Sequence, residues 1–197
     1  RYLLVRLEKK VKRVELASGE EKVVSWSDPY LYGVTLSPVG RYLAFITTKY
    51  VKKIQRIGNN SFEREEPEST LRVYDVMSGQ LLFSYLNPIP ATYFSFSRDG
   101  NKILFAEEGD IAVADIVRGQ IVRRYYGFSG SVWDLNFGKD DTWIIAASTD
   151  KTIRIWDVAS GKVLKTFKGH QAGIRVAHLS SDNTKILSAA DDHTARL

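Results

Sequence analysis

A strand-like run that ends in an acidic residue, with the turn closed by glycine four positions later, recurs at four places in this chain of 197 residues, and this recurrence constrains the fold more than any other feature. The acids are Glu15, Asp75, Asp115 and Asp157, and the intervals between them are 60, 40 and 42 residues. A run rich in β-branched and aromatic residues precedes each acid, as in "TIRIWD", and another run follows each glycine. A short carboxylate can accept hydrogen bonds from backbone N–H groups two residues on, and glycine supplies the positive φ of a tight turn. Each unit therefore predicts a β-hairpin.

Two further strand signals precede the hairpins, so the repeating unit has four strands. The first set reads "YGVTLSP", "TYFSFSRDG", "VWDLNFGKDD" and "IRVAHLSSDN", and the second reads "RYLAFIT", "NKILFAE", "TWIIAAS" and "TKILSAA". No stretch shows sustained helical periodicity, which predicts an all-β chain. Four strands in a repeat of about 40–45 residues are typical of a β-propeller, in which each repeat is one antiparallel blade.

The unit boundaries predict a single β-propeller segment over 1–197 with a partial blade at each end. The complete blades are expected at about 30–86, 91–126 and 132–168, and the partial blades at 1–26 and 173–197. The expected strand numbers are three, four, four, four and three, and we interpret the chain as a fragment of a larger propeller.

The first complete blade contains an insertion at 49–70 that accounts for the long repeat interval. A turn at Asn59–Asn60 would place Ile57 opposite Phe62, Arg56 opposite Glu63 and Lys53 opposite Glu66. Apolar and opposite-charge pairs of this kind stabilise a two-stranded ribbon. The sequence therefore predicts a protruding hairpin, with an irregular surface loop as the alternative.

Composition narrows the class of protein. The chain is 44% hydrophobic, yet it has no apolar run of about 18 residues, which excludes a transmembrane helix. It contains no cysteine, so disulfides and thiolate sites are excluded, and we expect a reducing compartment, the cytoplasm. The net charge of +5 indicates a mild preference for acidic partners.

Two segments resemble the WD-repeat (WD40-type) propeller family. They are "KGHQAGIRVAHLSSDNTKILSAADDHTARL" at 168–197 and "SGSVWDLNFGKDDTWIIAASTDKTIRIWD" at 129–157, where Gly-His, Asp-x-Thr and Trp-Asp stand at the family's spacing. Over 1–126 the resemblance rests on spacing, and the sequence there is also similar to the propellers of prolyl-oligopeptidase-like and TolB-like proteins. The resemblance implies a buried tetrad of hydrogen-bonded His, Ser or Thr, Asp and Trp. Carried over, the tetrad residues are His170, Ser188 and Asp192 in the last blade and Asp150 and Trp156 in the preceding one, where Phe128 and Ala146 replace the His and Ser.

We expect the tetrad residues to be structural, and we expect no catalytic, cofactor or metal site. The three histidines, His170, His178 and His193, have no cysteine partners and no helical His-Glu-x-x-His spacing. The stretch "GFSGS" at 127–131 lacks the last glycine of a Gly-x-Ser-x-Gly nucleophile elbow. The sequence therefore predicts a protein without enzymatic activity.

The resemblance implies a partner-binding face at the narrow top of the propeller. The position just inside the first strand of each blade usually points there, and in this chain it is occupied by Tyr32, Thr92, Trp133 and Arg175. Tyr30, Tyr125, Tyr126 and Phe128 either extend this patch or pack between blades. Our leading hypothesis is a non-catalytic scaffold that binds other proteins through this face.

Two alternatives stay open. The first is the propeller domain of a larger hydrolase whose catalytic part lies outside this chain. The second is binding of nucleic acid or a phosphorylated ligand by a basic face. The cations of the insertion are nearly offset by Glu63, Glu65, Glu66 and Glu68, so nucleic acid is not the expected partner.

Overall fold

The structure is a computed structural model that describes residues 2–7, 10–15, 18–25, 30–57, 60–87, 93–107, 109–180, 182 and 184–197. These residues form 18 strands in five sheets, and every strand pair is antiparallel. In the part of the chain that is described, no helix is long and apolar enough to cross a membrane. The chain divides into two compact units.

The first unit comprises residues 1–36 and 40–91 and contains two sheets. A three-stranded sheet has the order β1 (Tyr2–Leu7), β2 (Lys10–Glu15), β3 (Glu21–Ser25). A four-stranded sheet has the order β4 (Tyr30–Leu36), β5 (Tyr42–Ile57), β6 (Asn60–Asp75), β7 (Leu81–Asn87). In the second sheet Leu31, Leu43, Phe45 and Val76 form the core, and the rings of Phe45 and Tyr74 stack with their centroids 5.5 Å apart.

The second unit comprises residues 37–39 and 92–197 and contains three sheets. Two of these sheets have four strands. The first consists of β8 (Phe94–Phe96), β9 (Lys102–Ala106), β10 (Ile111–Asp115) and β11 (Gln120–Tyr125). The second consists of β12 (Val132–Phe137), β13 (Trp143–Ser148), β14 (Thr152–Asp157) and β15 (Val163–Lys168). The third has the order β16 (Ile174–Leu179), β17 (Ile186–Ala190), β18 (Ala195–Arg196). Ile145, Ala147 and Ile153 pack against Ile174 and Ala177 of the next sheet, so the core lies between successive sheets.

The predicted fold class is confirmed. The sheets contain three, four, four, four and three strands, each four-stranded sheet is formed by consecutive strands, and this is the arrangement of β-propeller blades. The middle strands β9, β10 and β13 are buried along nearly their whole length, whereas the outer strand β15 is largely exposed. A sheet covered on both faces needs near-continuous apolar middle strands, which explains runs such as "WIIAAS".

The acid-to-glycine units at Asp75, Asp115 and Asp157 form the predicted turns between the last two strands of the three four-stranded sheets. The carboxylate of Asp157 accepts a hydrogen bond from the backbone N–H of Ser160 at 2.7 Å, and Asp115 accepts one from Arg118 at 2.8 Å. Both bonds join residues three positions apart, one more than predicted, whereas Asp75 accepts from both Met77 and Ser78. The four glycines, Gly19, Gly79, Gly119 and Gly161, have φ values of 71°, 72°, 66° and 74°. These left-handed conformations explain why glycine recurs there.

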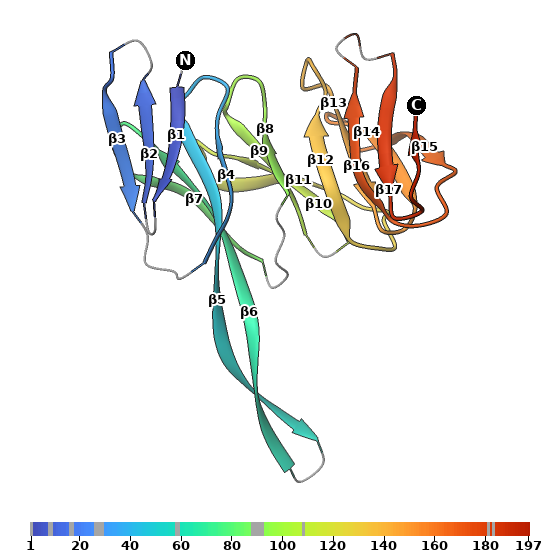
Figure 1. Ribbon diagram of the computed structural model, residues 1–197, viewed down its shortest axis with the longest axis horizontal. Coiled ribbons are helices and arrows are strands. Elements are labelled where there is room, and N and C mark those ends of the chain that lie inside the picture. The colour runs from blue at the N-terminus through green and yellow to red at the C-terminus, as the bar shows by residue number, and fades with distance from the viewer. Residues whose placement is uncertain are drawn as a thin grey trace. The chain divides into compact units, whose positions relative to one another are not determined.

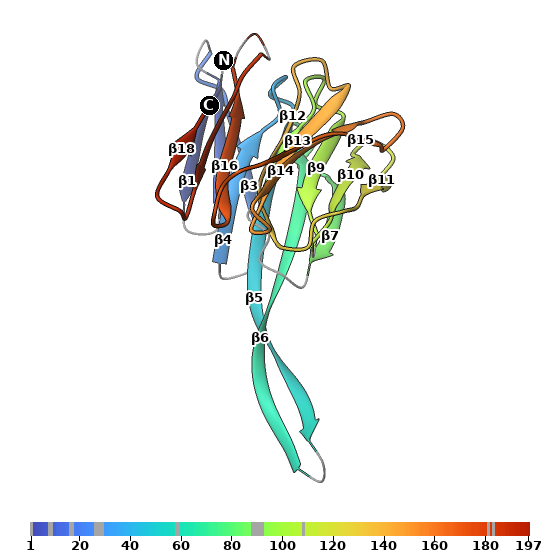
Figure 2. The same ribbon diagram turned by 90° about the vertical axis from the view of Figure 1, so that its right-hand side faces the viewer.

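Strands β5 and β6 continue far beyond the other two strands of their sheet as a twisted two-stranded ribbon (Figures 1 and 2). Their pairing runs from Tyr42↔Asp75 through Lys49↔Glu68 to Ile57↔Asn60 without a break in register. The predicted partners of Ile57 and Arg56 were therefore wrong by two residues, and Asn60 begins a strand instead of forming the turn. The reason is that packing in the sheet fixes the register, which the ribbon then inherits. The ammonium group of Lys53 still lies 2.9 Å from the carboxylate of Glu66, across a diagonal of the ladder.

Candidate functional site

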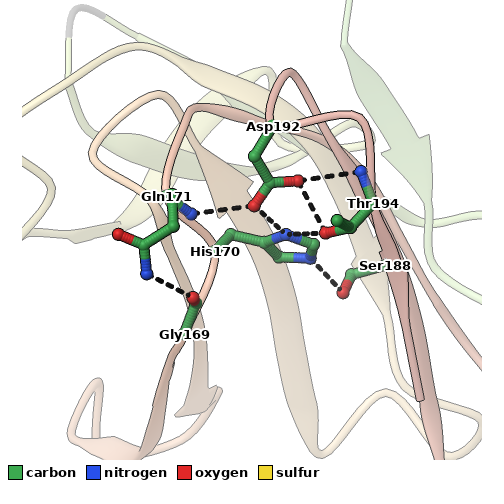
Figure 3. Close-up of polar contacts among 6 residues, drawn as sticks. All are labelled: Gly169, His170, Gln171, Ser188, Asp192 and Thr194. Carbon is green, nitrogen blue, oxygen red and sulfur yellow. Dashed lines mark hydrogen bonds and ion pairs between the residues drawn. The ribbon is translucent and has the colours of Figure 1, made fainter.

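A buried polar network surrounds His170 in the last sheet (Figure 3). The loop after β15 carries His170, strand β17 carries Ser188, and the turn between β17 and β18 carries Asp192 and Thr194. The ring of His170 lies 2.9 Å from the hydroxyl of Ser188 through Nε2 and 2.8 Å from the carboxylate of Asp192 through Nδ1. His170 and Ser188 are both buried. The structure thus brings together the three residues that the sequence singled out in this repeat.

Asp192 is held in its charged form by several donors. The hydroxyl of Thr194 donates to one carboxylate oxygen at 2.7 Å, and the backbone N–H of Gln171 donates to the other at 2.8 Å. The hydrogen bond from Thr194 has the largest effect on the pKa of Asp192, and it lowers that pKa. Partial burial raises the pKa, and the hydrogen bonds from Gln171 and His170 lower it again. The net result is a pKa of Asp192 below the ordinary value of an aspartate. An ionised carboxylate can only accept hydrogen bonds, so the Nδ1–H of His170 donates to Asp192. The Nε2 of the same ring is then free to accept a hydrogen bond from the hydroxyl of Ser188.

The hydroxyl, imidazole and carboxylate of this network have the composition of a hydrolase triad, but their placement differs from that of a triad. A nucleophilic serine must meet its substrate, and in α/β-hydrolases it stands on a sharp turn between a strand and a helix. Ser188 instead lies in the middle of β17 and is only 5% exposed. Its hydroxyl is therefore placed to satisfy a buried hydrogen bond.

The neighbouring sheet replaces this network with an aromatic and cationic cluster. Trp156 is fully buried, and the ring of Phe128 contacts it edge-on with centroids 5.3 Å apart. The guanidinium of Arg154 lies 4.9 Å from the ring centroid of Phe128, 3.5 Å from the carboxylate of Asp150, and donates to the carbonyl oxygen of Gly127. Arg154 thus lies beside the aromatic residue that replaces histidine in this repeat.

Two buried donors of this cluster lack acceptors in the described part of the chain. Among the described residues, neither the indole N–H of Trp156 nor the Nε of Arg154 has a hydrogen-bond partner, and both atoms are buried. Ala146, on the strand next to Trp156, carries no hydroxyl that could accept the indole proton. Asp150 does not reach Trp156; it accepts from the hydroxyl of Thr152 at 2.6 Å and from the backbone N–H of Ser129 at 3.2 Å.

A second cluster, partly exposed, joins two successive sheets of the second unit. The guanidinium of Arg175, on β16, lies 3.7 Å from the ring centroid of Trp133, on β12. Its Nε donates to the carboxylate of Asp191 at 2.8 Å. We call Trp133, Arg175 and Asp191 the Trp133–Arg175 surface. The hydrogen bond between Arg175 and Asp191 raises the pKa of the guanidinium and lowers the pKa of the carboxyl.

Both residues of the stack stand at equivalent irregularities of their strands. In β12 the register shifts between Val132 and Asp134, so Trp133 is the extra residue of a β-bulge. In β16 the register shifts between Ile174 and Val176, so Arg175 is the extra residue there. A bulge redirects its side chain away from the regular alternation, which explains how these side chains leave the core.

The other residues predicted for the partner face behave differently. Tyr32 is 41% exposed but is paired with Ile46, and Gly33, with a φ of 51°, is the extra residue of that strand. Thr92 lies outside the described residues. Tyr125 is buried and donates its hydroxyl to the carbonyl of Val158, so it is a packing residue. Burial raises its pKa to about 12.

Sequence reasoning found Trp133 and Arg175 but missed Asp191, which orients the guanidinium. Two consecutive acids, Asp191 and Asp192, stand at this turn in the sequence. The WD-repeat resemblance assigns a role only to Asp192, so the presence of a second acid was a signal that Asp191 has a partner of its own. Within the part of the chain that is described, no group of three or more His, Cys, Asp or Glu residues could hold a metal ion.

The sequence profile of the family described as "WD domain, G-beta repeat" matches residues 119–157 and 161–197. These two segments are WD40 repeats. They include β14 with Trp156 and Asp157, and the whole network of His170, Ser188 and Asp192. The WD40 repeat at 161–197 therefore carries the buried polar network, and the one at 119–157 carries the aromatic and cationic cluster that stands in its place.

A solved structure supports the propeller fold over nearly the whole chain. The chain is similar to one in the crystal structure of the mitotic checkpoint complex, with 19% sequence identity and a TM-score of 0.71. The similarity covers 96% of this chain and 54% of that one, so this chain spans about half the length of its structural relative. At this identity the likeness shows the fold alone. No curated protein matches the sequence.

Proposed function

We propose that this chain is a non-catalytic protein-interaction segment whose partner contacts the Trp133–Arg175 surface. The WD40 fold favours a scaffold role, and the stack of Arg175 on Trp133 is the observation that supports this particular surface. Tryptophan and arginine are the residues most often found as energetic anchors of protein interfaces. Both lie on strands of a sheet framework, so little conformational entropy is lost when a partner binds.

The chemistry of the surface favours a partner that presents a carboxylate beside an apolar group. The side chain of Arg175 is 56% exposed, and only its Nε has an acceptor among the described residues. Its terminal N–H groups are in position to make forked hydrogen bonds with a partner's Asp or Glu. The indole of Trp133 supplies apolar area beside them.

The proposal includes Tyr32 and Thr92 as further contacts and a cytoplasmic location. The family register supports Tyr32 and Thr92, since they correspond in sequence to Trp133 and Arg175. The absence of cysteine from the sequence supports the location. The partners are other proteins, with neither nucleic acid nor a membrane required.

The test begins with affinity purification of partners on the full-length protein, followed by measurement of the dissociation constant for each. Trp133→Ala and Arg175→Ala should each weaken binding by about 2 kcal/mol or more, roughly thirtyfold. Lys139→Glu is the matched control, because Lys139 is exposed in the turn between β12 and β13. Unchanged binding of the Trp133 and Arg175 variants, with loss only in the Lys139 variant, would move the interface away from this surface.

A further inference from the structure

Both strands of the ribbon have an edge without a neighbour. Pairing of β4 with β5 ends at Tyr30↔Thr48, and pairing of β6 with β7 begins at Ser69↔Asn87. In the described part of the chain, residues 49–57 and 60–68 therefore pair only with each other. Each presents a row of backbone N–H and C=O groups to which an extended segment can add as a further strand.

Pro67 makes the two edges different. Antiparallel partners alternate between pairs that exchange N–H···O=C bonds and pairs whose backbone groups point away from each other. Proline has no N–H, so it is tolerated where its nitrogen faces outward, and Pro67 is paired with Tyr50. The outward N–H groups of β5 are then those of Tyr50 and every second residue after it, which include Lys52 and Ile54. On β6 the same outward row is interrupted at Pro67, so β5 has the more complete edge.

The two edges of the ribbon also differ in the charge of their side chains. The segment 49–57 contains Lys49, Lys52, Lys53 and Arg56 and no acid, whereas the segment 60–68 contains four glutamates and one arginine. Lys49, Lys52 and Lys53 lie 3.5, 3.1 and 2.9 Å from Glu68, Glu63 and Glu66, and their side chains remain 51%, 68% and 51% exposed. The cations of the ribbon are therefore concentrated on β5, and although each of these three is paired with a glutamate of β6, each stays exposed enough to meet an acid on the free side of β5 as well.

Apolar side chains alternate with these lysines. Ile54, two residues from Lys52 on the same face of the ribbon, is 70% exposed. Val51 lies between Lys49 and Lys53 on the other face. A strand added beside β5 would thus meet a cation and then an aliphatic group on each of its faces.

We propose that the free edge of β5, residues 49–57, binds an extended acidic segment of a partner protein by strand addition. The incoming segment carries acids opposite Lys49, Lys52 and Lys53, and aliphatic residues opposite Val51 and Ile54. Opposite charges directly across a strand pair are favourable and like charges are not. This site is separate from the Trp133–Arg175 surface and does not depend on it.

A second copy of this chain fits the edge less well. Two β5 edges paired antiparallel would place a basic strand against a basic strand. Pairing of β5 with the β6 edge of another copy would join opposite charges, but Pro67 interrupts the row of donors that this pairing needs. The occupant that satisfies both the backbone and the charges is therefore an acidic segment of a different protein.

The test is a selection from a displayed library of random 12-residue peptides on the full chain, followed by fluorescence-anisotropy titration of the recovered peptides. The recovered sequences should carry acids at the positions that face Lys49, Lys52 and Lys53, which are three residues and then one residue apart, and aliphatic residues at those that face Val51 and Ile54. Lys52→Pro, which removes an outward N–H from β5, should weaken their binding about tenfold, the effect of losing one or two backbone hydrogen bonds. Glu65→Pro is the matched control, because Glu65 is the direct partner of Lys52 on the other edge, and it should leave binding unchanged.

Further variants separate charge from backbone. Lys52→Gln removes the charge without removing the N–H, so it should weaken binding less than Lys52→Pro does. The double variant Lys49→Glu/Lys53→Glu leaves every backbone group in place and should also weaken acidic peptides about tenfold. Far-ultraviolet circular dichroism of each variant checks that the strand content is unchanged.

Three results would overturn the proposal. One is recovery of no peptide, or of peptides without acids. Another is an equal loss of binding in Lys52→Pro and Glu65→Pro. The third is a dimer of the unmodified chain in sedimentation velocity that Lys52→Pro abolishes, which would make a second copy the occupant of this edge.

Discussion

Replacement of His170 by alanine measures how much stability the buried polar network supplies. The substitution removes a hydrogen bond of 2.8 Å to the Asp192 carboxylate and one of 2.9 Å to the Ser188 hydroxyl. A net contribution of about 1.5–3 kcal/mol is typical of a bond to a charged group, and about 0.5–1.5 kcal/mol of a neutral one. We therefore expect His170→Ala to lower the free energy of unfolding by roughly 2–4 kcal/mol. Part of the loss arises because the buried Ser188 hydroxyl keeps no imidazole partner.

The measurement is urea unfolding of the purified protein, followed by far-ultraviolet circular dichroism and tryptophan fluorescence. The free energy of unfolding falls linearly with denaturant, so the variant should show a lower midpoint with an unchanged slope. His178→Ala is the control, since His178 is an exposed residue of β16 and its loss should change stability by no more than about 0.5 kcal/mol. Ser188→Ala should lie between the two.

The reasoning fails if His170→Ala unfolds at the same urea concentration as the unmodified protein. It also fails if His170→Ala and Ser188→Ala keep full stability but abolish hydrolysis of an ester substrate by the unmodified protein. That second outcome would identify Ser188 as a nucleophile and His170 as its base.

Three further predictions concern stability. Hydrogen bonds from Ser180 and Thr184 lower the pKa of Asp182 to about 2, and the pKa values of Asp157 and Asp192 are lowered in the same way. Stability from these carboxylates is present above their ordinary pKa of about 4 and is lost as pH falls toward 2, so the urea midpoint should drop over that range, and less steeply in Asp182→Asn. Ala146→Ser gives the buried indole N–H of Trp156 an acceptor and should raise the free energy of unfolding by about 1 kcal/mol, measured by urea unfolding beside Ala146→Gly. Gly79→Ala places its new methyl group in open space but keeps a φ of 72°, so it should lower the free energy of unfolding by about 1 kcal/mol. Gly138→Ala should lower it more, because the methyl group would overlap the ring of Trp143, and thermal unfolding of both variants measures the difference.

The strand order could be predicted because the same pattern of strand-like runs and turns recurs four times in the sequence. An acid, a glycine four residues later and alternating apolar runs are local signals, and each repeat confirms the others. The residues around His170 could be predicted in the same way, because that repeat keeps every polar position of the family's pattern that lies within the chain. The structure adds the backbone N–H of Gln171, in the loop after β15, which has no separate sequence signal, and it shows that Thr194 of the Asp-x-Thr motif donates its hydroxyl to Asp192.

Other features depend on contacts that no local pattern records. The cluster of Arg154, Phe128 and Trp156 could not be predicted from the missing histidine, because an arginine on β14 reaches across to the preceding loop. The ribbon register was predicted from charge pairs near its tip, yet it is set at the other end, where Phe45 pairs with Arg72 in the packed sheet. Long side chains such as Lys53 can reach a glutamate from either register, so the charge pairs did not discriminate between them.

The network around His170 and the exposed donors of Arg175 and β5 differ in how fully they are hydrogen-bonded, and the difference supports placing function at the surface. The buried set around His170 is saturated: the imidazole has partners on both nitrogens, and Asp192 accepts bonds on both oxygens. A ligand that bound there would first have to break these bonds, which costs more than it returns unless every bond is replaced. A ligand that binds the terminal N–H groups of Arg175 or the outward N–H groups of β5 has no hydrogen bond within the described residues to break. Both are donors beside apolar side chains, Trp133 and Ile54, so we expect an acidic and partly apolar protein segment to bind at each of them.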